Sequence, residues 1–514
     1  MMDLLAPDGI TREEVRDSLL RHFGVRDDGE RETDRTFYDT FDGLVRAAGL
    51  AVVYEDGRLT LVDQDSGFEQ ASLDAPKPSR PLLAAELEPG PLRDALAPII
   101  DVRALLPLVH VRGREHALRL LDDQQKTVVR VTLEQPAAVS SSERLSELRP
   151  RLHLSVVRGY DKELRHACHE LEHELHYTAA NRALLDEAVS AIGGTPGGIS
   201  SKIAVALDRE QRADSAAALI LHRLLNVIEA NVAGTIADID TEFLHDFRVS
   251  IRRSRSVQRQ LRNVFPPSEL ERFRAEFRWL QQVTGDARDL DVYVLEFDQY
   301  RVMVPEEMRA DLAPLLGVLS RRRLAARAEM ASALRSERAT TLYPQWAALL
   351  ERLVALPEDD RPAAARPIAE VAGERIRKVY KRMVTMGRAI DDASPPESLH
   401  ELRKLGKELR YLLELFGAPL YPSDVVKPMI RALKGLQDVL GRHQDREIQV
   451  AMLRSLRDEV SGLADRAGAL MAMGALVQRL AEDQLEARGE FAERFATFAS
   501  HEQRAQVRHT FGTP

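Results

Sequence analysis

The chain has 514 residues, of which 30% are charged and 44% are hydrophobic, and its formal net charge is -9 at pH 7. It is long and apolar enough for several folded domains, and its acidity argues against a general nucleic-acid binder, so any polyanion site has to be local. The single cysteine, Cys168, excludes an intramolecular disulfide and favours a reducing compartment.

Taken in chain order, the first region predicts a mixture of helices and strands. Acids occupy the N-terminus, where a secretory signal would need basic residues. Thr11 and Glu14 have the spacing of a capping box at the start of a helix. We predict a hairpin with an Asp-Gly turn over 50–62, a second hairpin over 117–134, a strand over 151–159 and a long helix over 162–191.

The best linker in the chain is GGTPGGISS at 193–201, and a helical region follows it. From about residue 205, apolar residues recur at three- and four-residue intervals between proline-bearing breaks. The most apolar run, residues 216–234, is interrupted by His222, Arg223, Asn226 and Glu229, so we expect no membrane span and a cytoplasmic protein. The predicted division is an α+β domain at 1–192, a linker at 193–204 and an all-α domain at 205–505.

The helical region repeats itself. LHDFRVSIRRSR at 244–255 aligns with LHELRKLGKELR at 399–410, and LQQVTGDARDLD at 280–291 aligns with LQDVLGRHQDRE at 436–447. Two copies of one helical unit predict a pseudo-symmetric bundle with halves at about 205–345 and 360–500. In such a bundle, equivalent basic helices could face one another across a shared groove.

Each copy carries a stripe of basic side chains on one helix face. The stripe runs from His245 to Arg262 in the first copy and from His400 to Arg410 in the second, always at steps of 3 or 4 residues. Like charges at this spacing repel one another, so helix stability does not explain the stripes. Guanidinium and ammonium groups at this density suit a chain of phosphates, because Arg binds phosphate oxygens bidentately and Lys adds point charge.

These residues also have interpretations other than binding. A single charged run is more often a solvated helix face, and a lone His245 or His400 is more often a packing residue than a metal ligand. The carboxylates of GDARDLD are better explained as helix-end structure or as partners for basic side chains than as metal ligands. Because the stripe recurs in both copies, a binding surface is favoured.

The segments LHDFRVSIRRSRSVQRQL and LHELRKLGKELRYLLELF, with GDARDLDVYV after the first, resemble the CHAD domain, a family named for its histidines and its helical fold. The resemblance covers about residues 205–500. It implies two four-helix halves, a basic groove that binds inorganic polyphosphate, and association with polyphosphate granules. The implied binding residues are His245, Arg248, Arg252, Arg255 and Arg259, then His400, Arg403, Lys404, Lys407 and Arg410, with Lys427, Arg431 and Lys434 as an extension.

The region before residue 200 is similar in layout to a CYTH domain, which is an antiparallel β-barrel that forms a triphosphate tunnel. TFYDTFDGLVRAAGLAVVYEDGRLTLV at 36–62 and SSKIAVALD at 200–208 carry this likeness. The family's Glu-x-Glu-x-Lys motif is missing, and the strand predicted over 151–159 has no carboxylate. Because metal-dependent hydrolysis needs carboxylates to hold the ion, we predict a degenerate CYTH-like domain without a catalytic or metal site.

The sequence therefore predicts a polyphosphate-binding protein that has no cofactor, no turnover and no membrane partner. Two alternatives stay open: a metal-dependent triphosphatase in the CYTH-like domain, and nucleic-acid binding through the basic helices. Nucleic acid is disfavoured because single-strand recognition uses aromatic rings between basic groups, and the first stripe contains only Phe247.

Overall fold

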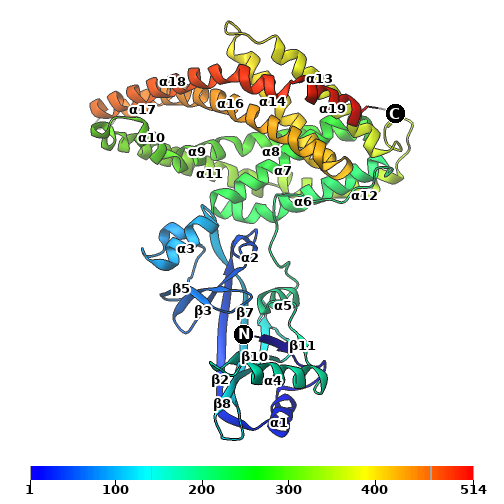
Figure 1. Cartoon of the computed structure of the whole chain (residues 1–514). Helices are drawn as coiled ribbons and strands as arrows, with labels where there is room; N and C mark the ends of the chain where they lie inside the picture. The colour runs from blue at the N-terminus through cyan, green and yellow to red at the C-terminus, as the bar shows by residue number, and fades with distance from the viewer. Residues whose placement is uncertain (1, 141, 463–465, 513–514) are drawn as a thin grey trace. The chain divides into compact units, whose positions relative to one another are not determined.

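The computed structural model describes residues 2–140, 142–462 and 466–512 (Figure 1). The chain divides into two compact units, Met1–Ser200 and Ser201–Pro514. The first unit is built mainly from strands and the second from helices.

One antiparallel sheet forms the frame of the first unit. Its strands are β1 (Met2–Leu5), β2 (Val25–Asp39), β3 (Leu50–Glu55), β4 (Arg58–Asp63), β5 (Glu69–Asp74), β6 (Leu82–Leu83), β7 (Ala104–Leu121), β8 (Thr127–Val139), β9 (Leu145–Glu147), β10 (Arg151–Val156) and β11 (Thr178–Ala179). Hydrogen bonds join them in the order β11-β1-β10-β8-β7-β2-β3-β4-β5, while β6 pairs with β7 and β9 with β8. The predicted antiparallel β domain is therefore confirmed.

Five helices pack onto this sheet. They are α1 (Arg12–His22), α2 (Leu44–Ala47), α3 (Pro91–Ile100), α4 (Asp161–His173) and α5 (Leu184–Ala191). One hydrophobic cluster joins Val15 and Leu19 of α1 and Leu171 of α4 to Val129 and Leu152 of the sheet. These contacts place α1 and α4 against β8 and β10.

Most of the predicted elements of this unit are confirmed. The capping box is formed, since Glu14 N–H donates to Thr11 Oγ1 and Thr11 N–H donates to Glu14 Oε2. The hairpin turn at Asp56 and Gly57 has positive φ at both residues, as an Asp-Gly turn requires. The single long helix predicted over 162–191 is wrong, because α4 ends at His173 and β11 pairs with β1 before α5 begins.

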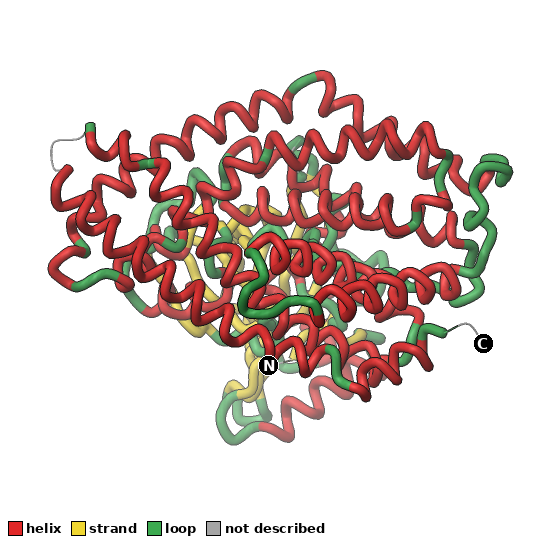
Figure 2. Tube along the Cα trace, turned by 90° about the horizontal axis from the view of Figure 1, so that it is seen from above, coloured by secondary structure: helices red, strands yellow, loops and turns green. Residues whose placement is uncertain are grey.

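The second unit consists of helices lying side by side (Figure 2). The first half of the chain in this unit supplies α6 (Ala213–Ala237), α7 (Thr241–Gln260), α8 (Pro267–Val283), α9 (Gly285–Leu295), α10 (Phe297–Met303), α11 (Ala313–Arg335) and α12 (Glu337–Arg352). The second half supplies α13 (Ile368–Arg388), α14 (Pro396–Leu412), α15 (Ala418–Leu420), α16 (Ser423–Ser455), α17 (Arg457–Ser461), α18 (Arg466–Phe498) and α19 (His501–Thr510).

The two halves of the helical unit share one core. Phe247 and Trp346 from the first half are buried in the same cluster as Leu402 and Leu436 from the second. Among the described residues, α6 is the one helix long and apolar enough to cross a membrane by length and composition, and 56% of that window is buried within the structure. Its apolar side chains belong to the shared core.

The repeat in the sequence is also a repeat of contacts. In each half, a stripe arginine donates to a glutamine, at 3.4 Å and 3.2 Å, and the stripe histidine bonds through Nδ1 to a later helix, at 2.9 Å and 2.7 Å. A Cβ built on the shared glycine would come within 3.9 Å or 3.8 Å of another stripe arginine. The equivalent pairs are Arg255–Gln281 and Arg410–Gln437, His245–Arg288 and His400–Gln444, and Arg248–Gly285 and Arg403–Gly441.

Candidate functional site

Helices α7 and α14 keep their basic stripes near the surface because each buries its apolar face. Asp240 caps α7 by accepting hydrogen bonds from the N–H groups of Glu242 and Phe243. Phe247 is fully buried in the shared core, and Leu402 of α14 is buried there as well. Because α7 and α14 pack against one another, the two stripes are brought together.

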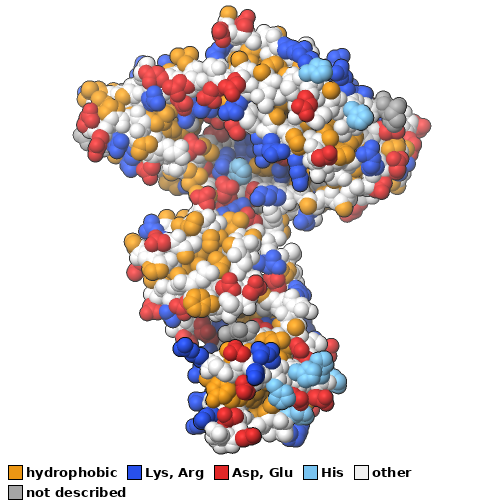
Figure 3. Space-filling view, viewed as in Figure 1, with side chains coloured by type: hydrophobic (Ala, Val, Ile, Leu, Met, Phe, Trp, Pro, Cys, Tyr) orange, Lys and Arg blue, Asp and Glu red, His pale blue; other side chains and the backbone are white. Residues whose placement is uncertain are grey.

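A hollow of about 430 Å³, which we call the basic hollow, lies between α7, α8 and α14. Among the described residues, seven cations line it against one carboxylate. Figure 3 shows Lys and Arg side chains gathered in the middle of the visible face of the helical unit. The lining is Arg252, Arg255, Ser256, Gln258, Arg259, Arg274, Arg278, Lys404, Lys407, Glu408 and Tyr411.

The cations of the basic hollow are poorly neutralised. Arg259 pairs with Glu408 at 2.7 Å, but Arg252 and Lys407 have no ion-pair partner in the part of the chain that the structure describes. Burial and the nearby arginines lower the pKa of Lys407 to about 8. Burial, followed by three neighbouring arginines, also lowers the pKa of Arg255. An anion would relieve this repulsion, so the hollow suits dense negative charge.

A second hollow of about 610 Å³, the mixed hollow, lies between α9, α14 and α16. Lys407 lines both hollows, so the two adjoin at this side chain. The mixed hollow is lined by carboxylates as well as cations, and Arg403 pairs with Asp445 at 3.0 Å. The charged lining is Arg403, Lys407, Arg410, Arg442 and Arg446 with Asp289, Glu296, Asp438 and Asp445.

The structure divides the predicted binding residues into two groups. Seven of them line a hollow, and six do not line either hollow as described. Those in the hollows are Arg252, Arg255, Arg259, Arg403, Lys404, Lys407 and Arg410. Those outside are His245, Arg248, His400, Lys427, Arg431 and Lys434.

Several residues outside the hollows support the fold around them. Arg248 donates to the Gln281 carbonyl at 2.9 Å and to Thr284 Oγ1 at 2.8 Å, which ties α7 to the end of α8. Burial lowers the pKa of Arg248 to about 10. His245 and His400 are held by Arg288 and Gln444 as described above. By contrast, Lys427, Arg431 and Lys434 are exposed on α16.

Two cations of the basic hollow were missed in the sequence. Arg274 and Arg278 lie one turn apart on α8, and their spacing of four residues places both on one face of that helix. This spacing is a signal that could have been used, but only the packing of α8 beside α7 and α14 shows that the pair faces the same hollow. Arg442 and Arg446 of α16 join the mixed hollow in the same way.

The first unit contains a cavity of about 490 Å³, which we call the sheet cavity. Arg35 pairs with the fully buried Glu134, and His153 bridges Asp3 at 2.8 Å and Glu134 at 3.1 Å. No local sequence pattern predicts this cluster, because its members lie on separate strands. The charged lining is Arg35, Arg58, Arg151 and His153 with Asp3, Glu55, Asp56, Asp63, Glu69 and Glu134.

The donors of the sheet cavity do not fit a divalent metal ion. Glu134 and Asp3 already accept hydrogen bonds from cationic or imidazole side chains. Within the described ranges, no group of three or more His, Cys, Asp or Glu side chains is arranged to hold a metal. No catalytic step through a metal follows from this cavity.

A family model and two relatives each match part of this chain. A family model described as the CHAD domain matches residues 219–454. Two uncharacterized proteins of Mycobacterium tuberculosis, from strains CDC 1551 and H37Rv, are 31% identical to the chain over 208 residues, which is 39% of this chain and 38% of each relative. The chain therefore matches about two fifths of the length of these relatives.

Two solved structures match part of this chain. The crystal structure of the CHAD domain from the plant Ricinus communis has a TM-score of 0.49 and 25% identity, and the match covers 58% of this chain and 96% of that chain. PptA from Streptomyces chartreusis has a TM-score of 0.41 and 16% identity, and the match covers 55% of this chain and 99% of that chain.

Proposed function

We propose that this chain, whose residues 219–454 form a CHAD domain, binds inorganic polyphosphate in the basic hollow. The CHAD family is linked to polyphosphate binding in general. The observation that carries the proposal for this chain is the charge imbalance of the basic hollow, with seven cations against one carboxylate among its described lining residues. The β-rich unit that precedes it is consistent with a CYTH-like barrel.

The arrangement of the cations explains how a linear polyanion would be held. Arg252 and Arg255 of α7 can each bind phosphate oxygens with two N–H groups, while Lys407 adds a point charge from α14. Because Lys407 also lines the mixed hollow, a chain of phosphates can pass from one hollow to the other at this residue. Arg403 and Arg410 would then meet the chain on the far side of Lys407.

Nucleic acid is a poorer fit to the same surface. Stacking platforms for bases are exposed aromatic side chains between the basic groups. The aromatic residue that lines the basic hollow, Tyr411, is only 5% exposed and its ring is covered by neighbouring side chains. A ligand that consists of phosphates alone needs no such platform.

Polyphosphate binding to the double variant Arg252→Gln, Lys407→Gln tests the proposal. Each substitution removes one charge-assisted contact, and we expect the pair to weaken binding by about 100-fold. The matched control is Arg322→Gln, Arg457→Gln, because these exposed arginines pair with Glu459 and Asp458 away from both hollows. Equal binding by the wild type and the hollow variant would refute the site.

Competition separates polyphosphate from nucleic acid as the ligand. Long-chain polyphosphate should stay bound when DNA or RNA is added at an equal concentration of phosphate. Binding should weaken steeply with added salt in either case, because phosphate contacts release counterions. Displacement by nucleic acid at equal phosphate would favour the alternative ligand. Association with polyphosphate granules stays a prediction from the family resemblance.

A further inference from the structure

We propose that the basic face of α13 forms a second subsite, which holds the continuation of a long polyphosphate chain after it leaves the basic hollow. The inference rests on the proposed function and adds a chain-length dependence to it. A short chain would fill the basic hollow alone, whereas a long chain would also engage α13.

The basic face of α13 has the same spacing as the two stripes of α7 and α14. Arg375, Lys378 and Arg382 follow one another at steps of 3 and 4 residues, and Lys381 lies beside them. The nearest acid on the same helix, Glu374, is already paired with Arg366 at 2.6 Å. Among the described residues, Lys378, Lys381 and Arg382 therefore form no ion pair with an acid of their own helix.

Arg375 connects this stripe to the basic hollow. Its guanidinium donates two hydrogen bonds to Gln260 Oε1, at 3.2 Å and 2.8 Å. Gln260 in turn donates to Glu408 Oε2 at 2.7 Å, and Glu408 also holds Arg259. Burial, then Arg262 just beyond the end of α7, and also Arg259 of α7 lower the pKa of Arg375, so these cations lie close to α13.

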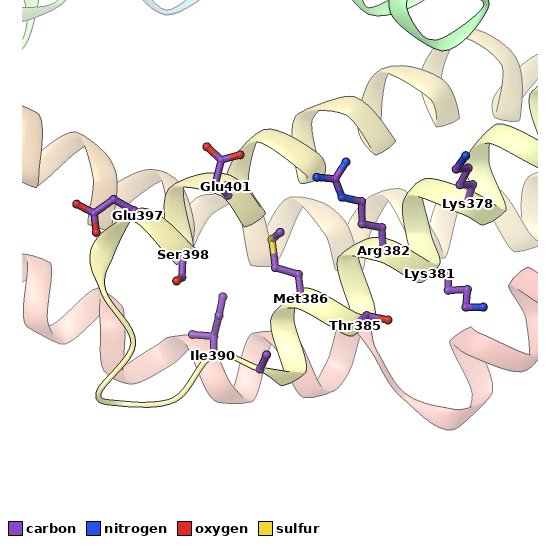
Figure 4. A pocket seen from close by; sticks show the side chains of 10 residues that line it. Lys378, Lys381, Arg382, Thr385, Met386, Ile390, Glu397, Ser398 and Glu401 are labelled. Atoms are coloured by element: carbon purple, nitrogen blue, oxygen red, sulfur yellow. The ribbon is translucent and has the colours of Figure 1, made fainter.

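Beyond Arg375 lies a third hollow, of about 710 Å³, which we call the α13 hollow (Figure 4). Lys378, Lys381 and Arg382 form its basic wall, and all three are exposed. None of them has an ion-pair partner in the described part of the chain. The remaining lining is Thr385 and Met386 of α13, Ala389 and Ile390 just after it, and Glu397, Ser398 and Glu401 of α14.

The basic hollow and the α13 hollow also meet on the α14 side. Lys404 lines the basic hollow, Glu401 lines the α13 hollow, and the two side chains form an ion pair at 2.6 Å. Lys404 and, more weakly, His400 and Arg382 lower the pKa of Glu401, which places Arg382 near the same edge. Figure 4 shows the side chain of Arg382 directed toward Glu401.

The side chains that line the α13 hollow indicate which wall a phosphate chain would follow. Met386, Ala389 and Ile390 offer nothing to phosphate oxygens, and Glu397 repels them. The chain would therefore follow the wall of Lys378, Lys381 and Arg382. If this wall were only a solvated helix face, it would not need the hydrogen bonds that link Arg375 to the basic hollow or the Lys404–Glu401 pair between the two hollows. Both of these links are present.

The test compares two ligands, tripolyphosphate and a long-chain polyphosphate, on the full chain. The variant Lys378→Gln, Lys381→Gln, Arg382→Gln should bind the long chain about tenfold more weakly, as three exposed contacts predict. Its salt dependence should fall by about 2 in log–log slope, at roughly 0.7 per lost contact on a flexible chain. Binding of tripolyphosphate should change by less than about twofold.

A charge-matched control variant is Arg322→Gln, Arg454→Gln, Arg457→Gln, which removes three exposed arginines near α17. Long-chain affinity that is equal in the α13 variant and the control would overturn the inference and leave the proposed function intact. An equal loss of affinity for both ligands would also overturn the inference. The effect would then come from the overall electrostatic field of the protein and not from contacts along α13. If the wild type binds neither ligand, the proposed function fails as well.

Discussion

The sheet cavity and the basic hollow differ in how far their arginines are paired with carboxylates. In the sheet cavity, Arg35 pairs with Glu134, and Arg58 pairs with Glu69. In the basic hollow, Arg252 has no ion-pair partner among the described residues. The cavity is lined by more carboxylates than cations, and the hollow by many more cations than carboxylates.

This difference separates cations that hold a fold from cations that await a ligand. A buried pair whose partner is removed leaves an uncompensated charge, so paired arginines are needed for stability. Unpaired cations held side by side cost stability through repulsion and desolvation. Such destabilising groups of cations are retained in a protein where a function requires them. Changes in the two regions should therefore have opposite effects.

The largest expected effect is on stability, in the sheet cavity. Glu134→Ala leaves Arg35 and His153 without the buried carboxylate that both contact, and should lower the free energy of unfolding of the first unit by about 3 kcal/mol. Calorimetry of the full chain measures this loss, and hydrogen exchange should speed up only within Met1–Ser200. Arg252→Gln is the control and should leave stability within about 0.5 kcal/mol. If Glu134→Ala left the free energy of unfolding unchanged, the proposed contrast between the sheet cavity and the basic hollow would be lost.

The second effect is a pH dependence that the basic hollow alone should show. Lys407 has a pKa of about 8, lowered by burial and by nearby arginines. A bound polyanion favours the charged amine, so binding above about pH 8 takes up a proton and affinity falls as pH rises. Between about pH 7 and about pH 9 the loss should approach tenfold.

Lys407→Arg is the control for this titration, because an arginine keeps its charge over the whole range. The variant should bind polyphosphate with nearly constant affinity where the wild type weakens. A wild type with flat affinity up to about pH 9 would show that Lys407 does not touch the ligand. Titration by isothermal calorimetry in buffers of different ionisation enthalpy reports the proton uptake directly.

The third expected effect is a gain in stability, whereas the first is a loss. Lys407→Met removes a partly buried amine that is crowded by cations and should raise the free energy of unfolding by about 1 kcal/mol. The gain should be full below about pH 8 and should shrink above it, since the unfolded chain then keeps a proton that the folded chain has lost. The same variant should bind polyphosphate more weakly. A loss of stability would mean that Lys407 supports the fold.

The local signals in the sequence predicted much of this structure. The Thr11–Glu14 capping box and the Asp56–Gly57 turn are decided by neighbouring residues, so their patterns were sufficient. The helical repeat was equally visible because both copies keep the same contacts, as the pairing of Arg255 with Gln281 and of Arg410 with Gln437 illustrates.

What the sequence did not reveal is which stripe residues stay accessible. Spacing places Arg248 and Arg252 on one face of α7, but the end of α8 covers Arg248 while Arg252 faces the hollow. Arg274 and Arg278 reach the same hollow from another helix. The sheet cavity was missed for a similar reason, since Arg151 and Glu134 become neighbours only through the register of β10 and β8.

The smallest predicted effect concerns the one carboxylate among the described lining residues of the basic hollow. Glu408 pairs with Arg259 at 2.7 Å and accepts a hydrogen bond from Gln260 at 2.7 Å. It competes with a polyanion for Arg259, which is half exposed and free to turn toward a ligand. Glu408→Gln keeps the shape of the side chain and can still bond Gln260, but it removes the competing charge. We expect polyphosphate affinity to rise about threefold, the scale of one exposed ion pair.

Glu307→Gln serves as the control, because it removes an equal charge from an exposed site outside the hollows. If affinity rises equally in both variants, net charge alone is responsible and Glu408 has no special place. If Glu408→Gln weakens binding, Glu408 positions Arg259 for the ligand and does not compete for it. In that case the hollow would share one property with the sheet cavity, since a carboxylate would hold an arginine in place in both. A threefold gain confined to Glu408→Gln would keep the two regions apart, with paired arginines serving the fold in one and displaceable pairs serving the ligand in the other.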